Sequence, residues 1–415
     1  MKKNRNDLLI ILIFVILLSY LNYIYVMAAL QDNLSDYRAH TYSFLPLFTR
    51  QTFWQGWMAV PYCAWHLLAL FFHRILLIPI EVSAAYSTCA FASFTYLVFY
   101  WVLQKIQLRF ELGENSIKTA FIAFCLCIAN PLSAFWLDSS AFSMNAVHSA
   151  TYSCVKGFSL LCFCLVCDIW NKQKDPEYRG IFFPVENGLK KYYVYLAFIL
   201  FLSAAAKPTF AEVFIPAVAL CMLVTWIHRI RCRNGSAKPY FRHCLYTFYC
   251  AIPTLIYILA QFTAYFLLGG SDGNNGSMII TKFLEVWKLF SENVVLSIVL
   301  SLAFPLFMIL IDTAHFFRTD MGRLSLVCLA VGFLEAAFLG EEGQKLGHGN
   351  FMWPIMSAML LVYTVSTLRL LVLEKKQNDT TAKSVLLSVA WLLFCLHALA
   401  GILDFVDFVS IPRPG

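Results

Sequence analysis

The sequence predicts an all-α protein, a polytopic bundle of about eleven transmembrane helices in one domain, residues 1–415. Composition is the first observation: 60% of the residues are hydrophobic and 13% are charged, against about 45–50% and about 25% in soluble proteins. Secondly, apolar runs of about 20 residues recur along the chain, each long enough to cross a hydrocarbon core of roughly 30 Å. Thirdly, these runs do not alternate between apolar and polar residues as barrel strands do, so they are expected to be helices.

The first apolar run extends from Leu8 to Leu30, after the basic start Met1-Lys-Lys-Asn-Arg5. It is longer than the apolar region of about 7–15 residues in a secretory signal, so we expect a retained first span, although Val26-Met-Ala28 resembles a cleavage site. The eleven expected spans are residues 8–30, 82–104, 117–137, 148–170, 192–208, 209–228, 244–268, 289–311, 324–340, 351–373 and 384–403.

The first connection, about residues 31–81, is the longest, and we expect it to carry juxtamembrane helices. Its second half, residues 61–80, is apolar but is interrupted by His66, His73, Arg74 and Pro79. We therefore expect this half to lie on the membrane surface or half-buried, with a short extra span as the alternative.

The distribution of basic residues predicts the orientation. If the N-terminus is cytoplasmic, 22 of the 31 Lys and Arg residues fall in the segments on that side, as the positive-inside rule requires. The net charge of +7 is then explained by topology. Because no basic stretch is interleaved with aromatic residues, we expect no nucleic-acid partner.

Several function classes lack their sequence motifs. The chain contains no GxxxxGK[ST] or GxGxxG phosphate loop, no HExxH motif and no GxSxG nucleophile elbow. Nearly all of the fourteen cysteines lie in apolar runs, which does not indicate a disulfide framework. Cys164 and Cys167 have redox spacing but lie inside a span, where small apolar packing residues are the simpler interpretation.

Ionisable residues gather in four connections on the predicted outer side. Such residues in or near spans cost a few kcal/mol each and are usually functional. The candidate catalytic acids are Asp36, Asp32, Glu341 and Glu342. The candidate substrate-binding residues are Arg38, His40, His66, His148, Lys156, Lys207, Lys345, His348 and Asn350. We expect these connections, together with the nearby Asp138, to meet at one cavity.

Each candidate also has a purely structural interpretation. Asp32 and Asp36 suit the cap of a helix, His66 suits interfacial packing, and Lys156 suits a side chain that extends to the membrane surface. The pair Lys207-Pro208 suits a helix end. Glu341-Glu342 suits a solvated turn, and His348 before Gly-Asn suits turn chemistry. A functional site is favoured because four separate connections show the same pattern.

The layout resembles the GT-C class of membrane glycosyltransferases. The resemblance rests on the many spans and on Asp36 (or Asp32), which matches by position the catalytic acid that follows span one in that class. The stretch Tyr62-Cys-Ala-Trp-His66 resembles the surface helix that comes next. Lys207-Pro-Thr209 and Gly349-Asn-Phe-Met-Trp353 look like features of bacterial membrane proteins linked to surface polysaccharides. The resemblance covers most of the chain by architecture, but only about a dozen residues follow the last expected span, so we expect no large soluble C-terminal domain of the kind common in the class.

The resemblance implies a function at the bacterial cytoplasmic membrane, in cell-envelope polysaccharide synthesis. The enzyme would move a sugar from a polyprenyl-phosphate-type carrier to a glycan, lipid or protein acceptor on the outer face. An acid would serve as general base, and Arg38, Lys156, Lys207 and Lys345 would neutralise the carrier phosphate. No cofactor is indicated by a motif, and a divalent cation is compatible with the class.

Three other functions fit the same sequence. A large outer loop late in the chain would favour a polysaccharide polymerase or ligase, but the late loop of this chain, residues 340–350, is short. A flippase for lipid-linked glycans predicts polar residues near the bilayer midplane in matched broken helices, whereas the charges here gather at one face. A non-catalytic assembly protein is the third alternative.

Overall fold

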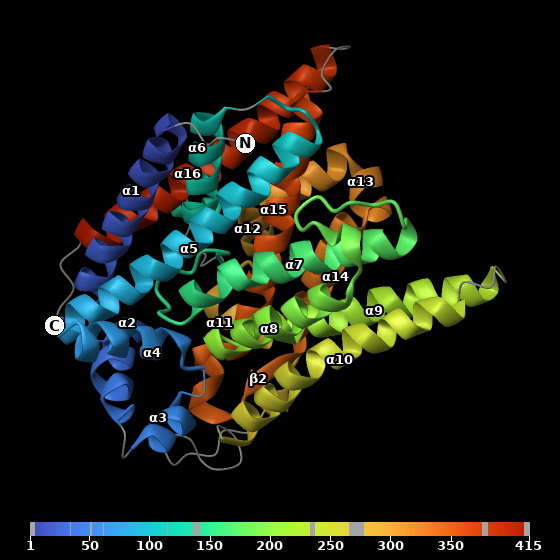
Figure 1. Ribbon diagram of the computed structural model, residues 1–415. Coiled ribbons are helices and arrows are strands. Elements are labelled where there is room, and N and C mark those ends of the chain that lie inside the picture. Colours follow the sequence, from blue (N-terminus) through green and yellow to red (C-terminus); the bar gives the residue numbers. More distant parts are fainter. Residues whose placement is uncertain are drawn as a thin grey trace.

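The computed structural model describes residues 5–33, 35–49, 52–60, 62–113, 115–135, 142–232, 237–264, 278–375 and 381–410. Over these residues the protein is an all-α helical bundle with one small two-stranded sheet (Figure 1). The predicted fold class is thereby confirmed at the level of a helical bundle. Asp138 lies outside the described residues.

Nine helices among the described residues are long and apolar enough to cross a membrane, which is typical of an integral membrane protein. They are α1 (Arg5–Ala29), α5 (Ile80–Arg109), α7 (Tyr152–Lys174), α9 (Thr209–Arg231), α10 (Ala237–Phe262), α12 (Val294–Ile311), α14 (Asp320–Phe338), α15 (Trp353–Lys375) and α16 (Thr381–Ser410). Each corresponds to one of the eleven expected spans.

The other two expected spans form shorter helices. The segment 117–137 gives α6 (Ser116–Ile128), 13 residues long, and the segment 192–208 gives α8 (Lys190–Ala206), 17 residues long. At about 1.5 Å per residue these helices measure roughly 20 and 26 Å. Both end before a proline, which disfavours helical backbone in the preceding residue. Pro131 follows α6, and Pro208 follows Lys207, whose backbone is extended at φ −166° and ψ 133°.

Two helices form the centre of the bundle. In the most apolar windows of α15 and α7, 94% and 89% of the residues are buried. In α1 and α10 the corresponding shares are 28% and 22%. Figure 1 shows α7 and α15 in the interior, with α1 at one edge and α9 and α10 at another. The peripheral helices keep apolar side chains on their outer surfaces, as expected for helices that face lipid.

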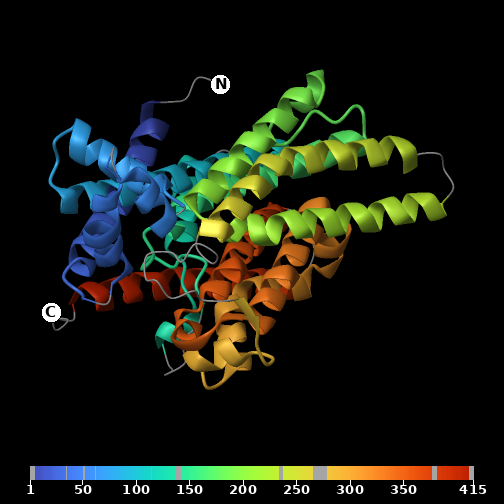
Figure 2. The same cartoon turned by 90° about the horizontal axis from the view of Figure 1, so that it is seen from below.

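Helices α9 and α10 form a long pair that extends beyond the rest of the bundle. Figure 2 shows this pair, in yellow-green and yellow, projecting from one side of the molecule. Helix α10 also packs against α8, and α9 also packs against α14 and α15. The pair therefore joins the central helices to the periphery.

The first connection folds into short helical segments. They are α2 (Asp36–Arg38), the π-helices η1 (Ala39–Phe44) and η3 (Phe71–Ile75), the 3₁₀ turn η2 (Leu45–Leu47), α3 (Phe53–Ala59) and α4 (Ala64–Leu70). Helix α4 packs against α5. Segment 61–80 thus contains only short helices among its described residues, too short for the extra span that the sequence left open.

Other connections lie at the same end of the bundle as the first. Strand β1 (Met278–Ile280) pairs antiparallel with β2 (Leu339–Glu341), and α11 (Glu285–Phe290) packs against α14. The remaining elements there are η4 (Leu132–Phe135), η7 (Gly343–His348) and η8 (Asn350–Met352). We call this end the site end. The opposite end carries η5 (Val185–Asn187) and α13 (Thr313–Arg318).

Candidate functional site

A carboxylate and two histidines of the first connection form a chain of polar contacts, here called the first-loop cluster. Ser35 caps α2 by accepting a hydrogen bond from the Tyr37 amide, which places Asp36 in the first turn. His40, four residues later, faces Asp36 with its Nε2 atom 3.3 Å from Asp36 Oδ1. The other ring nitrogen of His40, Nδ1, lies 3.0 Å from Nε2 of His66 on α4. The cluster thus links two helices of the loop.

Electrostatics favour the ionised form of Asp36. Burial alone would raise the pKa of this carboxyl, but attraction and a hydrogen bond from His40 outweigh it. Lys207 and a hydrogen bond from Ser149 add to the effect, so the pKa lies well below its usual range. The Asp36 side chain is nevertheless 39% exposed. The carboxylate is therefore held by protein partners and still accessible from outside the cluster.

His66 is held neutral at the inner end of the cluster. Its side chain is fully buried, and Phe48 stacks on its ring at 5.1 Å. Burial lowers the pKa of His66 well below its ordinary value, and repulsion from His40 lowers it further, while Asp36 opposes the shift. Its Nδ1 atom has no hydrogen-bond partner among the described residues. The ring therefore stays neutral and contacts His40 without adding charge to the cluster.

Lys207 brings the first-loop cluster together with the helices of the bundle. It follows α8 and is only 8% exposed. Its ammonium donates a hydrogen bond of 3.3 Å to the Ser149 hydroxyl and lies 3.8 Å from the centre of the Trp353 ring, a cation–π distance. Ser149 therefore contacts both Lys207 and Asp36.

A cavity of about 150 Å³ lies on the other side of Lys207 and is here called the lysine cavity. Its wall includes Tyr62, Lys207, Glu212, Glu341 and Trp353. The Glu341 side chain is 2% exposed; its Oε2 atom accepts a hydrogen bond of 2.6 Å from Asn350. Its Oε1 atom has no hydrogen-bond partner among the residues that the structure describes. One carboxylate oxygen is thus available to a ligand.

The raised pKa of Glu341 suits this role. Burial raises the pKa of the carboxyl, and the Asn350 hydrogen bond and the charges of His348 and Lys345 only partly oppose the shift. An incoming hydroxyl or amine would satisfy the free oxygen, since buried polar groups without partners are costly.

Two further acids lie near the lysine cavity inside the bundle. Glu212, in the first turn of α9, interacts electrostatically with Lys207. Glu335, on α14, interacts with Glu212. Both side chains are partly buried. Three glutamates and one lysine therefore surround the same region, a polarity that bare packing of apolar helices would not require.

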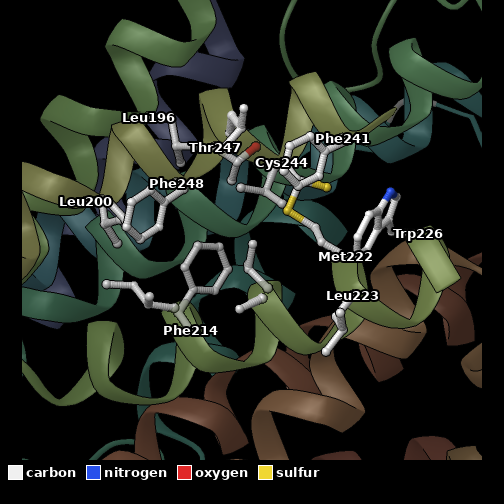
Figure 3. A pocket seen from close by; sticks show the side chains of 16 residues that line it. Leu196, Leu200, Phe214, Met222, Leu223, Trp226, Phe241, Cys244, Thr247 and Phe248 are labelled. Atoms are coloured by element: carbon white, nitrogen blue, oxygen red, sulfur yellow. The ribbon is translucent and has the colours of Figure 1, made fainter. Parts of the chain in front are cut away.

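An apolar groove of about 290 Å³ lies along the same helix pair as the lysine cavity. Figure 3 shows its lining side chains, including Phe214 and Met222 of α9 and Phe241 and Phe248 of α10. Ile215 in the groove wall is three residues from Glu212 in the cavity wall, and Ala251 is seven residues from Ile258. These spacings place the lining residues on one face of each helix. The polar cavity and the apolar groove thus follow one another along α9 and α10.

Several predicted site residues meet here. Asp36, His40 and His66 form the first-loop cluster, and Lys207 lies between it and the lysine cavity. The exposed His148 interacts electrostatically with Asp36 and Lys207, and its ring lies 5.4 Å from Trp353. Glu341 and Asn350 line the cavity. Lys345 and His348 belong to η7 and interact electrostatically with Glu341.

Two predicted phosphate-binding residues are used elsewhere. Arg38 donates a hydrogen bond of 3.1 Å to the Leu30 carbonyl at the end of α1. Lys156 is buried in α7 and donates a hydrogen bond of 3.1 Å to the Asn145 side chain. Asn145 in turn bonds the carbonyls of Leu126 and Ala129, near the end of α6. Arg38 therefore satisfies a carbonyl at the end of α1, and Lys156 supports, through Asn145, the end of α6. Carbonyl groups at helix ends lack partners within the helix.

The two remaining candidate acids lie in turns of the site end. Asp32 is half-buried in the turn after α1, where its amide bonds the Ala29 carbonyl. Glu342 is exposed, beside the buried Glu341.

Sequence reasoning misses Ser149 and Glu335. A single serine in a loop carries no signal, so Ser149 could not have been found. Glu335 is an acid inside an apolar run, and its cost in a membrane was a usable signal. No group of three or more His, Cys, Asp or Glu residues within the described ranges is arranged to hold a metal ion.

No protein-family model matches this chain, and no curated protein matches it in sequence.

Proposed function

We propose that this protein is a membrane glycosyltransferase. It would transfer a sugar from a polyprenyl-phosphate-type carrier to an acceptor on the outer face of the membrane. The observation that carries the proposal is the position of Lys207. This buried cation lies between an ionised carboxylate, Asp36, and a polar cavity that is followed along α9 and α10 by an apolar groove.

An amphipathic donor fits this succession of surfaces. Its phosphate would lie at Lys207, where a buried ammonium offers charge-assisted hydrogen bonds. Its apolar chain would follow the groove between Phe214, Met222 and Phe248, where side-chain packing would replace contacts with lipid tails of similar polarity. Nucleotide sugars stay in the cytosol, so a site facing outward needs a donor that crosses the membrane on a lipid.

Asp36 would act on the acceptor. In the proposed reaction the acceptor oxygen attacks the anomeric carbon, the bond from that carbon to the phosphate oxygen breaks, and the carrier phosphate leaves. Asp36 takes the proton of the acceptor hydroxyl as general base. Lys207 holds the carrier phosphate through a contact that exists before and during the transfer. His40 holds the carboxylate in place through its contact of 3.3 Å.

A transfer assay with the full chain in proteoliposomes tests the proposal. The donor is a polyprenyl phosphate carrying a radiolabelled sugar, and envelope lipids and glycans supply the acceptors. We expect loss of label from the donor and release of polyprenyl phosphate. A nucleotide sugar should not replace the donor. Movement of intact donor between leaflets, with no loss of its sugar, would instead identify a flippase.

A further inference from the structure

A second cavity, of about 360 Å³, lies at the end opposite the lysine cavity. The ends of α5 and α7, the loop after α7, helix α13, the start of α14 and the later turns of α15 form its wall. Part of the wall is apolar, with Ile106, Phe110, Leu368 and Val372. A cavity of this size is within the usual range for small-ligand sites, roughly 300–1,000 Å³.

Cations outnumber acids in this wall. Lys174, Arg318 and Arg369 line the cavity, and Asp320 is the one carboxylate among the described residues that line it. Asp320 is shared by two cations, because Lys174 Nζ lies 2.6 Å from its Oδ2 atom and Arg323 lies 2.6 Å from its Oδ1 atom. That triad carries one uncompensated positive charge.

Arg318 supplies a second positive charge. Arg369 pairs with Asp312, which leaves that pair neutral. Arg318 is exposed and makes no ion pair with any residue in the described part of the chain. The charged side chains among the described residues that line the cavity, three cations and one carboxylate, therefore carry a net charge of +2 beside an apolar surface.

We infer that this cavity is a binding site for a phosphate monoester that carries an apolar group. A phosphate monoester has a charge of about −1.5 to −2 at pH 7, which matches the excess. Its oxygens would accept hydrogen bonds from Arg318 and Lys174, and its apolar group would cover Ile106 and Leu368. The inference does not depend on the proposed transfer reaction, because no residue is shared between the two sites.

Two sources can supply such a ligand. One is a lipid whose phosphate head group lies at this surface of the membrane, since basic pockets between membrane helices bind anionic head groups. The other is a soluble phosphate ester. The recognition chemistry is the same, and access distinguishes the sources.

Calorimetry on the full chain in phosphatidylcholine nanodiscs tests the inference, with hexyl phosphate as the probe. We expect saturable binding of hexyl phosphate, weaker binding of inorganic phosphate and no binding of hexanol. Arg318→Glu should weaken hexyl phosphate binding about tenfold or more, because it removes a charge-assisted contact and adds repulsion. Arg318→Lys should retain most of the affinity.

Arg231→Glu is the matched control, because Arg231 is an exposed arginine that does not line the cavity. Its binding should stay within about twofold of the original chain, as for a distant surface charge. Phosphatidic acid in the nanodisc should compete with hexyl phosphate if the source is a lipid, and should not compete if it is soluble. Absence of saturable binding, or an equal loss in the Arg318 and Arg231 variants, would overturn the inference.

Discussion

The ionisation of Asp36 depends on residues from three parts of the chain. His40 belongs to the same loop, Ser149 precedes α7, and Lys207 follows α8. A carboxylate held by so many partners is ordered and charged, but it is also a weaker base than a free one. The proposed base therefore works through position next to the acceptor more than through a raised pKa.

His40→Gln should move the acid limb of the pH profile to higher pH. His40 stabilises the charged form of Asp36, so its loss raises the pKa of the carboxyl toward the ordinary value near 3.9. Activity that needs the carboxylate then disappears at a higher pH as the solution is acidified. The measurement is kcat/KM against pH, with His73→Gln as the control histidine in the same loop. An unchanged acid limb would mean that His40 does not tune Asp36.

Lys207→Ala should raise the donor concentration that gives half-maximal rate. A phosphate contact exists in the ground state and in the transition state, so its loss acts mainly on KM. Loss of a hydrogen bond to a charged group, about 1.5–3 kcal/mol, predicts an increase of roughly 10–100-fold. Lys288→Ala removes an exposed lysine on the site end and should leave KM unchanged. A fall in kcat with constant KM would place Lys207 in the chemical step instead.

Single residues were predictable where their chemistry was costly. Asp36, His148 and Lys207 stand out in the sequence because charges near spans are expensive, and the structure places them together. Arg38 and Lys156 carry the same signal but bind the Leu30 carbonyl and the Asn145 amide. One sequence does not distinguish a cation that binds a ligand from one that stabilises the end of a helix.

For the helices, the sequence predicts features that depend on each segment alone, but it does not predict contacts between segments. Length and hydropathy predict the nine long helices, because each must bury or expose its own apolar side chains. Helices α6 and α8 end before the expected spans do, although Pro131 and Pro208 favour an earlier end. Contacts between helices distant in sequence, such as α16 with α6, could not be predicted from one sequence.

Gly401→Ala should weaken the contact between α16 and α6. A Cβ atom built at Gly401 would lie 2.7 Å from the carbonyl carbon of Ile128, well inside contact distance, and the obstacle is backbone. Overpacking of this kind typically costs about 1–3 kcal/mol, occasionally more. We expect a lower Tm in detergent. Gly347→Ala is the matched control, because a Cβ there meets nothing within 4 Å. Equal Tm values for the two variants would show that α16 and α6 pack differently.

Each end of the described part of the molecule has a cavity with charged residues in its wall. At the site end the charges surround the lysine cavity, and at the opposite end they surround the phosphate-binding cavity proposed above. The distribution of basic residues in the sequence predicts that the site end lies at the outer face of the membrane.

Cys232 provides a natural probe of this orientation. It is exposed at the end of α9, whereas most of the other described cysteines are buried or half-buried. We expect a membrane-impermeant maleimide to label Cys232 only after the cells are permeabilised. Lys282→Cys, at an exposed position of the site end, should be labelled in intact cells. Labelling of Cys232 from outside would reverse the orientation and remove the argument for a lipid-carried donor.

Asp36→Asn tests the central claim most directly. The substitution keeps the shape of the side chain and removes the proton acceptor. In proteoliposomes with the radiolabelled polyprenyl-phosphate sugar, turnover should fall by about 10²–10⁴-fold, the usual contribution of a general base. Glu292→Gln, an exposed carboxylate of the site end, should keep full turnover. Full activity in Asp36→Asn would contradict the account and would move the role to Asp32 or Glu341.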